Sequence, residues 1–161
     1  MISKLPKLPV FPMTPEDCVY VCQEIRQDDF KEFIATQQAQ TKGEIIRQLL
    51  AQNGEHYTIC NKNNIPVLIG GTFYENPGVA TIWLIATDKI SKRDWWVTTT
   101  FIKGLMDLLL DTKTCHRIQA SSIGWRFVAQ KWLKRLGLEY EGTLKGFCKN
   151  GYDLLLYGKV G

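Results

Sequence analysis

The stretch that decides the fold is Ala80-Thr81-Ile82-Trp83-Leu84-Ile85-Ala86-Thr87, followed by Asp88-Lys89-Ile90-Ser91-Lys92-Arg93-Asp94. The first part is rich in apolar and β-branched residues and predicts a buried strand. A helix is predicted directly after it, from Asp94 through Leu110. Strand–turn–helix units bind phosphate when glycines let backbone N–H groups close on the anion at the helix N-terminus. The connection here contains no glycine. The strand and the helix of such a phosphate site are therefore predicted, but its glycine-bearing turn is not.

Length and composition indicate one domain over residues 1–161, with residues 1–13 as an extended N-terminal arm or first strand. Apolar residues make up 45% of the chain. No apolar run approaches the ~18 residues that a membrane helix requires. The first residues are too short and too rich in proline for a signal peptide. The net charge of +4 is mild and does not by itself indicate nucleic acid as a partner.

Neither a disulfide framework nor a metal site is predicted from the cysteines. Their number is odd and they are scattered, which favours free thiols in a reducing cytosol: Cys18, Cys22, Cys60, Cys115 and Cys148. Cys18 and Cys22 share a helix face, but no further Cys or His completes a ligand set at metal-binding spacing.

Start and stop signals predict an alternating α/β chain. Thr14-Pro15-Glu16-Asp17 begins a helix, and Thr41-Lys42-Gly43-Glu44 resembles a capping box. Helical segments are predicted over 14–26, 28–36, 41–53, 94–111 and 125–136. Strands are predicted over 56–60, 65–73, 80–87, 115–121, 139–147 and 152–157, the last two joined by a hairpin turn at 149–151. This order predicts a mixed α/β domain.

Four short sequence motifs follow one another along the chain: Thr14-Pro15-Glu16-Asp17 with Arg26, Asp29 and Glu32; Pro66-Val67-Leu68-Ile69-Gly70-Gly71; Trp83-Leu84-Ile85-Ala86-Thr87-Asp88; and Trp132-Leu133-Lys134-Arg135-Leu136-Gly137-Leu138. Their order is similar to that of the GNAT (acyl-CoA N-acyltransferase) superfamily. It is closest to the GNAT-like proteins of tailed bacteriophages, such as the small internal virion protein of short-tailed phages. The resemblance implies a mixed sheet of about six to seven strands flanked by about four helices.

In working GNAT enzymes the strand that matches 80–87 splays from its neighbour, and its backbone pairs with the pantetheine arm of the cofactor. The resemblance therefore implies that any acyl-CoA would meet six positions: Leu84, Ile85, Ala86, Lys89, Lys92 and Arg93. Acetyl-CoA is the implied cofactor, with weak binding expected because the glycine turn is missing.

Three positions depart from the GNAT pattern. The asparagine found in many members falls on Arg126, the tyrosine used as general acid falls on Leu133, and the following Gly-Phe is Gly137-Leu138. Leucine has no proton to donate, so these departures put catalysis in doubt.

Two residues are candidates for a catalytic base. His56 stands at the start of a strand, where a solvated edge histidine is the alternative. Glu75 belongs to Glu75-Asn76-Pro77-Gly78, which also has the composition of a turn.

Packing predictions concern the core and two surface features. One core cluster is expected to contain Trp83, Leu84, Ile102, Leu105, Leu109, Ile118 and Trp132. Trp95 and Trp96 are adjacent on a helix, so one is expected to face outward as a candidate contact residue. The proline-spaced arm 5–13 either contacts a partner or forms the first strand of its own sheet.

Two functions from different classes follow. The first is a phage virion-associated or morphogenesis protein with eroded acetyltransferase motifs, acting through contacts with other phage structural proteins or with copies of itself. It would reside in the host cytoplasm, with incorporation into the virion as a further option. The alternative is an active enzyme that transfers an acetyl group from acetyl-CoA to a protein or small-molecule amine. The sequence leaves open whether the chain is an enzyme.

Overall fold

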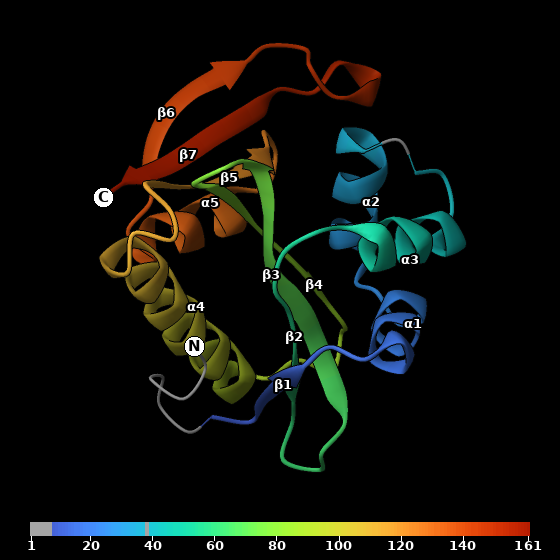
Figure 1. Ribbon diagram of the computed structural model, residues 1–161. Coiled ribbons are helices and arrows are strands. Elements are labelled where there is room, and N and C mark those ends of the chain that lie inside the picture. Colours follow the sequence, from blue (N-terminus) through green and yellow to red (C-terminus); the bar gives the residue numbers. More distant parts are fainter. Residues whose placement is uncertain (1–7, 38) are drawn as a thin grey trace.

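The computed structural model describes residues 8–37 and 39–161. This part of the chain folds into one seven-stranded mixed sheet covered by five α-helices (Figure 1). The elements follow in the order β1 (Val10–Pro12), α1 (Pro15–Gln23), α2 (Gln27–Thr36), α3 (Lys42–Ala51), β2 (His56–Cys60), β3 (Pro66–Asn76), β4 (Val79–Ala86), α4 (Lys92–Asp111), β5 (Arg117–Ile123), α5 (Phe127–Arg135), β6 (Glu139–Leu144), the short 3₁₀ helix η2 (Lys149–Gly151) and β7 (Leu154–Val160). The predicted α/β class and the expectation of six to seven strands are confirmed. The five α-helices match the five helical segments predicted from the sequence and are one more than the about four that the resemblance implies.

The helices begin where side chains satisfy their first backbone donors. Thr14 accepts a hydrogen bond from the Asp17 N–H, and Asp17 accepts one from the Thr14 N–H. Thr41 caps α3 by accepting from the Glu44 N–H. These are the local signals that the sequence carries, so the starts of α1 and α3 agree with the prediction.

The sheet has the strand order β1-β2-β3-β4-β5-β7-β6. β4 and β5 are its parallel pair, and they pair over only three positions, from Val79 with Arg117 to Thr81 with Gln119. Beyond these positions the two strands diverge. The sheet therefore has an opening between the carboxyl ends of β4 and β5.

The structure describes only a part of the arm predicted over 5–13. Val10–Pro12 forms the edge strand β1 and pairs antiparallel with β2. Of the two alternatives for the arm, its described part follows the second, the first strand of the chain's own sheet. Residues 1–7 lie outside the described residues.

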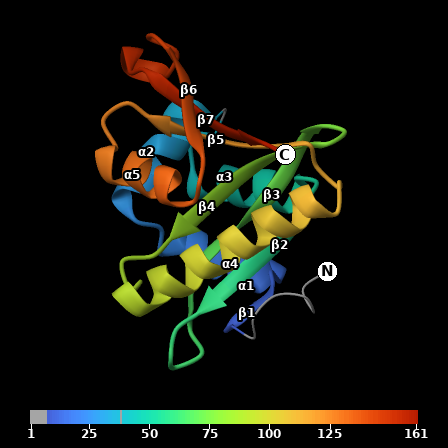
Figure 2. The same ribbon diagram turned by 90° about the vertical axis from the view of Figure 1, so that its left-hand side faces the viewer.

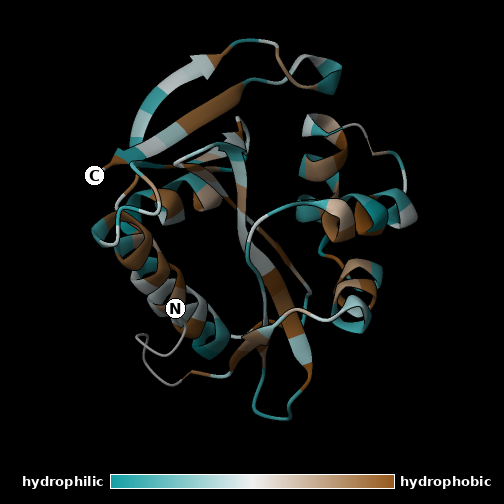
Figure 3. Ribbon diagram, viewed as in Figure 1, coloured by the Kyte–Doolittle hydropathy of each residue, from teal (hydrophilic) through white to brown (hydrophobic). Residues whose placement is uncertain are grey.

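The helices form two layers around the sheet. α1, α2 and α3 lie on one side, and α4 and α5 lie on the other (Figures 1 and 2). One apolar cluster fills the space between the sheet and the second layer, and it includes Leu105, Leu109 and Ile118. Another lies against α1 and α3 and includes Ile45, Leu49 and Ile69. Apolar colouring concentrates on the central strands and on the inner sides of the helices (Figure 3).

The predicted core is correct on the α4 side and wrong for the two residues of β4. Ile102 is buried in the α4 cluster with Leu105, and Trp132 packs against that cluster. Trp83 instead packs with the α1–α3 cluster, and Leu84 packs in a third cluster near the start of α4. Successive residues of a strand point to opposite faces, so neighbours on β4 cannot share one cluster.

The connection between β6 and β7 is longer than the predicted hairpin. The turn expected at 149–151 is the 3₁₀ helix η2, and β7 begins only at Leu154. Asn150 takes φ 67° there, a left-handed conformation that asparagine tolerates better than most residues. The Asp153 carboxylate accepts a hydrogen bond from the Gly146 N–H and holds this loop together.

His56 packs against Trp83 across a glycine. Gly71 of β3 pairs with both residues, and having no side chain it lets the two rings meet edge to face at 5.6 Å. The His56 Nε2 and Trp83 Nε1 atoms are buried without hydrogen-bond partners among the described residues. Desolvation by burial lowers the pKa of His56 below its ordinary value of 6.5.

Replacing Leu105 with alanine tests the packing of α4. Leu105 is 3% exposed, and truncating a buried leucine costs about 2–5 kcal/mol through lost burial and the cavity left behind. We expect a loss of this size in the free energy of unfolding, measured by urea denaturation. Lys103→Ala, on the exposed side of the same helix, is the control and should change it by less than about 0.5 kcal/mol. Similar values for the two variants would contradict the packing described.

Burial of His56 also predicts a pH dependence of stability. Because its pKa is lowered in the fold, the unfolded chain binds more protons just below pH 6.5, so this contribution to stability is lost as the pH falls from 6.5 towards the folded value. His56→Gln should remove that part of the slope in urea midpoints measured between pH 7.5 and pH 5. His116→Gln, at an exposed position, serves as the control. An unchanged slope in His56→Gln would contradict the burial of this ring.

Candidate functional site

The opening between β4 and β5 is the place where the resemblance to GNAT enzymes implies backbone contacts to acyl-CoA. The Thr87 N–H donates to the Val67 carbonyl of β3 at 2.9 Å. Backbone groups alternate in direction along an antiparallel strand, so Ile85 also directs its groups to β3. Leu84 and Ala86 direct theirs into the opening.

Helix α2 and the residue before it close this opening. The Ala86 N–H donates to Asp29 Oδ2 at 2.8 Å, and the Ala86 carbonyl accepts from the Arg26 N–H at 2.9 Å. On the opposite strand, the Ile123 N–H donates to Glu32 Oε2 at 2.9 Å. One side of α2 therefore satisfies backbone groups at the ends of both diverging strands.

Two arginines balance the two carboxylates. Arg26 binds Asp29 through its Nε and a terminal nitrogen, at 3.1 and 2.9 Å. Arg126, which precedes α5, donates to Asp29 Oδ1 at 2.8 Å and to Glu32 Oε1 at 3.4 Å. The Asp29 side chain is 3% exposed and that of Arg126 is 14% exposed. We call Arg26, Asp29, Glu32 and Arg126 the gap network.

The gap network is buried and reaches the second helix layer. Burial raises the pKa of Glu32 above its usual range, and the positive charge of Arg126 opposes that shift. The Arg26 guanidinium stacks over the Trp95 ring of α4, 5.1 Å from its centroid. The network thus connects α2, β4, β5, α4 and the start of α5.

The N-terminus of α4 is occupied by the chain's own side chains. The Ser91 N–H donates to Asp94 Oδ2 at 2.9 Å, and Ser91 Oγ accepts from the Asp94 N–H at 3.2 Å. Asp94 is 1% exposed. Its carboxylate takes the favourable anion position at the positive end of the helix dipole.

The predicted phosphate-binding cations surround this helix start. Lys89, Lys92 and Arg93 are all exposed. The Lys89 ammonium donates to the Tyr20 hydroxyl of α1 at 3.4 Å, and Arg93 lies 3.6 Å from the Asp94 carboxylate. The structure therefore brings these three cations near the place where the sequence puts phosphates.

The two candidate bases lie in different surroundings. His56 is packed against Trp83 on the α1–α3 side. Glu75 is exposed at the end of β3 and accepts a hydrogen bond from Thr81 at 3.3 Å, across the β3–β4 turn. Gly71, the partner of His56, is four residues from Glu75, which is about 13 Å along a strand. The structure does not bring the two together.

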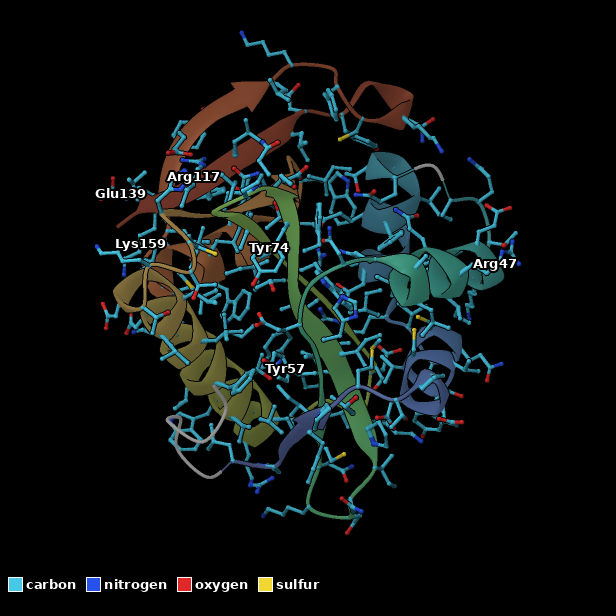
Figure 4. The ribbon with its side chains drawn as sticks, in the orientation of Figure 1. Arg47, Tyr57, Tyr74, Arg117, Glu139 and Lys159 are labelled. Carbon is cyan, nitrogen blue, oxygen red and sulfur yellow. The ribbon has the colours of Figure 1, made fainter. Side chains whose placement is uncertain are left out.

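A polar cluster that the sequence did not predict lies on the α4 side of the sheet. The Tyr74 hydroxyl and the Thr72 hydroxyl donate to Glu55 Oε2 at 3.2 and 3.3 Å. Burial is the main cause that raises the pKa of Tyr74, and also that of Tyr57, to about 12. Figure 4 shows both rings between β3 and α4, away from the opening beside β4.

Sequence reasoning also missed the role of the gap network. Arg26, Asp29 and Glu32 belong to one of the motifs on which the GNAT resemblance rests, but the motif by itself predicts no function for them. Their spacing of three residues places them on one side of a helix, and this was the available signal.

Two hollows on the described residues lie away from the opening between β4 and β5. One is a void of about 10 Å³ beside Tyr57 and Phe101, and the other is a shallow depression on α1 that includes Val19 and Tyr20. Within the same residues, no group of three His, Cys, Asp or Glu side chains could hold a metal ion. None of the helices described is long and apolar enough to cross a membrane.

Comparison with known proteins supports the fold. No protein-family model and no curated protein sequence matches the chain. Among solved structures, ribosomal-protein-alanine N-acetyltransferase from Brucella melitensis is 14% identical with a TM-score of 0.74, covering 96% of this chain and 100% of that one. A GNAT-family acetyltransferase from Bacillus anthracis is 13% identical with a TM-score of 0.68, covering 94% and 93%. AAC(6')-Ib in complex with ribostamycin and coenzyme A is 17% identical with a TM-score of 0.69, covering 96% and 94%.

These similarities concern the fold, because the identities are low. They confirm the GNAT prediction at that level and leave its phage-specific part a prediction. The chain has the fold of the GNAT acetyltransferases.

Proposed function

We propose that this chain uses the GNAT fold for protein contacts and does not bind acetyl-CoA tightly. The observation that carries the proposal is the closed opening between β4 and β5. Both inward-facing groups of Ala86 are already bonded, its N–H to Asp29 and its carbonyl to Arg26.

A pantetheine arm would have to break the gap network before it could pair with β4. Moving Asp29 away from Ala86 would also separate it from Arg26 and Arg126, which it binds at 2.9 and 2.8 Å. Breaking a buried ion pair is costly because it leaves an uncompensated charge. The ligand would need to supply that free energy from its own contacts.

The remaining parts of a transferase site support the same proposal. The buried carboxylate of Asp94 stands at the α4 N-terminus and would repel a pyrophosphate. Leu133, at the position where the resemblance expects a proton-donating tyrosine, is 6% exposed and packs in the core. It can serve packing but not acid catalysis.

The resemblance to phage proteins gives the proposal its specific form. In that form the chain is a virion-associated or morphogenesis protein with eroded acetyltransferase motifs. Its partners are other phage structural proteins or further copies of the chain, met in the host cytoplasm or in the virion.

The second candidate function is N-acetylation of an amine with acetyl-CoA. Two observations favour it: the fold is that of N-acetyltransferases, and three exposed cations stand beside the start of α4, namely Lys89, Lys92 and Arg93. In this case α2 must move away from β4 when the cofactor binds.

Calorimetry with acetyl-CoA separates the two candidates. Because the chain's own groups occupy Ala86 and the α4 N-terminus, we expect weak binding or none. A dissociation constant in the low micromolar range would overturn the contact proposal in favour of the enzyme. In that event Lys92→Ala with Arg93→Ala should weaken binding, and added salt should weaken it further.

Replacing Asp29 with asparagine tests whether the gap network holds the sheet together. The variant keeps the shape of the side chain but leaves Arg26 and Arg126 without their shared charge, so it should lower the free energy of unfolding by about 3–5 kcal/mol. Asp28→Asn removes the same charge from the neighbouring exposed position and should cost less than about 1 kcal/mol. Urea denaturation measures the free energy of unfolding of both variants. Equal losses would contradict a stabilising role of the gap network.

A further inference from the structure

Helices α4 and α5 both lie on the side of the sheet that is turned towards the viewer in Figure 2, and they meet through long side chains. Trp132 of α5 packs edge to face against Trp95 of α4, with ring centroids 5.8 Å apart. Its indole N–H donates to the Thr99 hydroxyl at 2.9 Å. These contacts fix which sides of the two helices are adjacent.

Helical spacing places exposed residues on both sides of this contact. Lys92, Trp96 and Lys103 form a stripe along α4 next to Trp95 and Thr99. The matching stripe on α5 runs beside Trp132 and contains Val128, Lys131 and Arg135. We define the α4–α5 surface as the six exposed residues Lys92, Trp96, Lys103, Val128, Lys131 and Arg135.

The cations of this surface outnumber the exposed acidic residues on the same two helices. None of its four cations forms an ion pair with another described residue. α5 contains no acidic residue. The exposed acids of α4 are Asp107 and Asp111, and Asp107, one helical turn after Lys103, pairs with Lys159. A net charge of +4 for the whole chain conceals this local excess.

The same surface exposes apolar side chains that normally avoid water. Trp96 is 62% exposed and Val128 is 82% exposed. An exposed tryptophan is typical of the energetic centre of a protein interface, and Trp96 has Lys92 one helical turn away on the same stripe. Trp96 is also the outward member of the Trp95–Trp96 pair that the sequence predicts.

We propose that the α4–α5 surface binds an acidic segment of a partner protein, with Trp96 and Val128 covered by apolar side chains of that segment. This inference rests on the proposed contact function and names the chemistry of the partner. The four cations would pair with carboxylates at the rim and speed association.

The exposed side chains favour a protein over a nucleic acid. Single-strand binding proteins stack successive bases on several aromatic rings along a positive groove. The exposed aromatic rings of α4 and α5 are Trp96 and Phe127, one on each helix and not in a row, and Val128 is an aliphatic side chain that a phosphate backbone would leave in water. A segment with both carboxylates and leucines satisfies both features.

The test uses a fluorescein-labelled synthetic peptide rich in Glu and Leu, titrated with the full chain and followed by anisotropy. We expect binding that weakens with salt, and at least a tenfold loss of affinity in Trp96→Ala and in the double variant Lys131→Glu with Arg135→Glu. The control double variant Lys31→Glu with Lys62→Glu removes the same charge from exposed positions on α2 and the β2–β3 turn. It should keep the affinity within twofold. Circular dichroism confirms that each variant is folded.

Three results would overturn the inference. The first is no binding of the peptide, and the second is an equal loss in the control variant, which would indicate non-specific charge attraction. The third is tighter binding of a labelled oligothymidine that depends on the same residues, which would indicate a nucleic-acid surface. None of these results affects the acetyl-CoA titration, which alone decides whether the contact proposal stands.

Discussion

The carboxylate of Asp29 holds together the part of the fold where the sheet comes apart. β4 and β5 pair over three positions and then diverge, and backbone groups at the ends of both strands need partners. Asp29 binds the Ala86 N–H of β4 and is itself held by Arg26 and Arg126. Without it, two guanidinium groups and a strand end would lose their shared partner. The packing of α2 against the diverging ends of β4 and β5 therefore relies on the buried charge of Asp29.

A diverging strand pair can be completed by a bound ligand or by the protein itself. In this chain the protein completes it, because α2 supplies a carboxylate to each strand end. Carboxylates are costly to bury, as the raised pKa of Glu32 indicates, so the arrangement requires the two arginines. The start of α4 is likewise completed by the protein itself, because the Asp94 carboxylate occupies the position at the helix N-terminus that favours an anion. In both places the fold satisfies its exposed backbone groups with its own side chains.

The two helix layers differ in what they bury and in what they leave exposed. α1, α2 and α3 cover one side of the sheet, and α2 also closes the opening. α4 and α5 bury their inner sides and leave cations and two apolar side chains exposed on their outer face. Arg26 connects the layers, since its guanidinium stacks on Trp95, which in turn packs on Trp132. The closed opening and the exposed α4–α5 surface are therefore parts of one packed unit.

The sequence by itself determined the local features. Thr14, Thr41 and the period-two strands predict the elements, and adjacent helical positions predict that only one of Trp95 and Trp96 turns outward. Such signals act over three or four residues, so one chain suffices to detect them. Only the tertiary structure decided the gap network, because Asp29 meets Ala86 and Arg126 across 57 and 97 residues. It also decided that His56 meets Trp83 over Gly71, and that α5 meets α4 through Trp132 and Trp95. Contacts of that separation depend on how strands and helices are arranged in space, and local propensity carries no information about that arrangement.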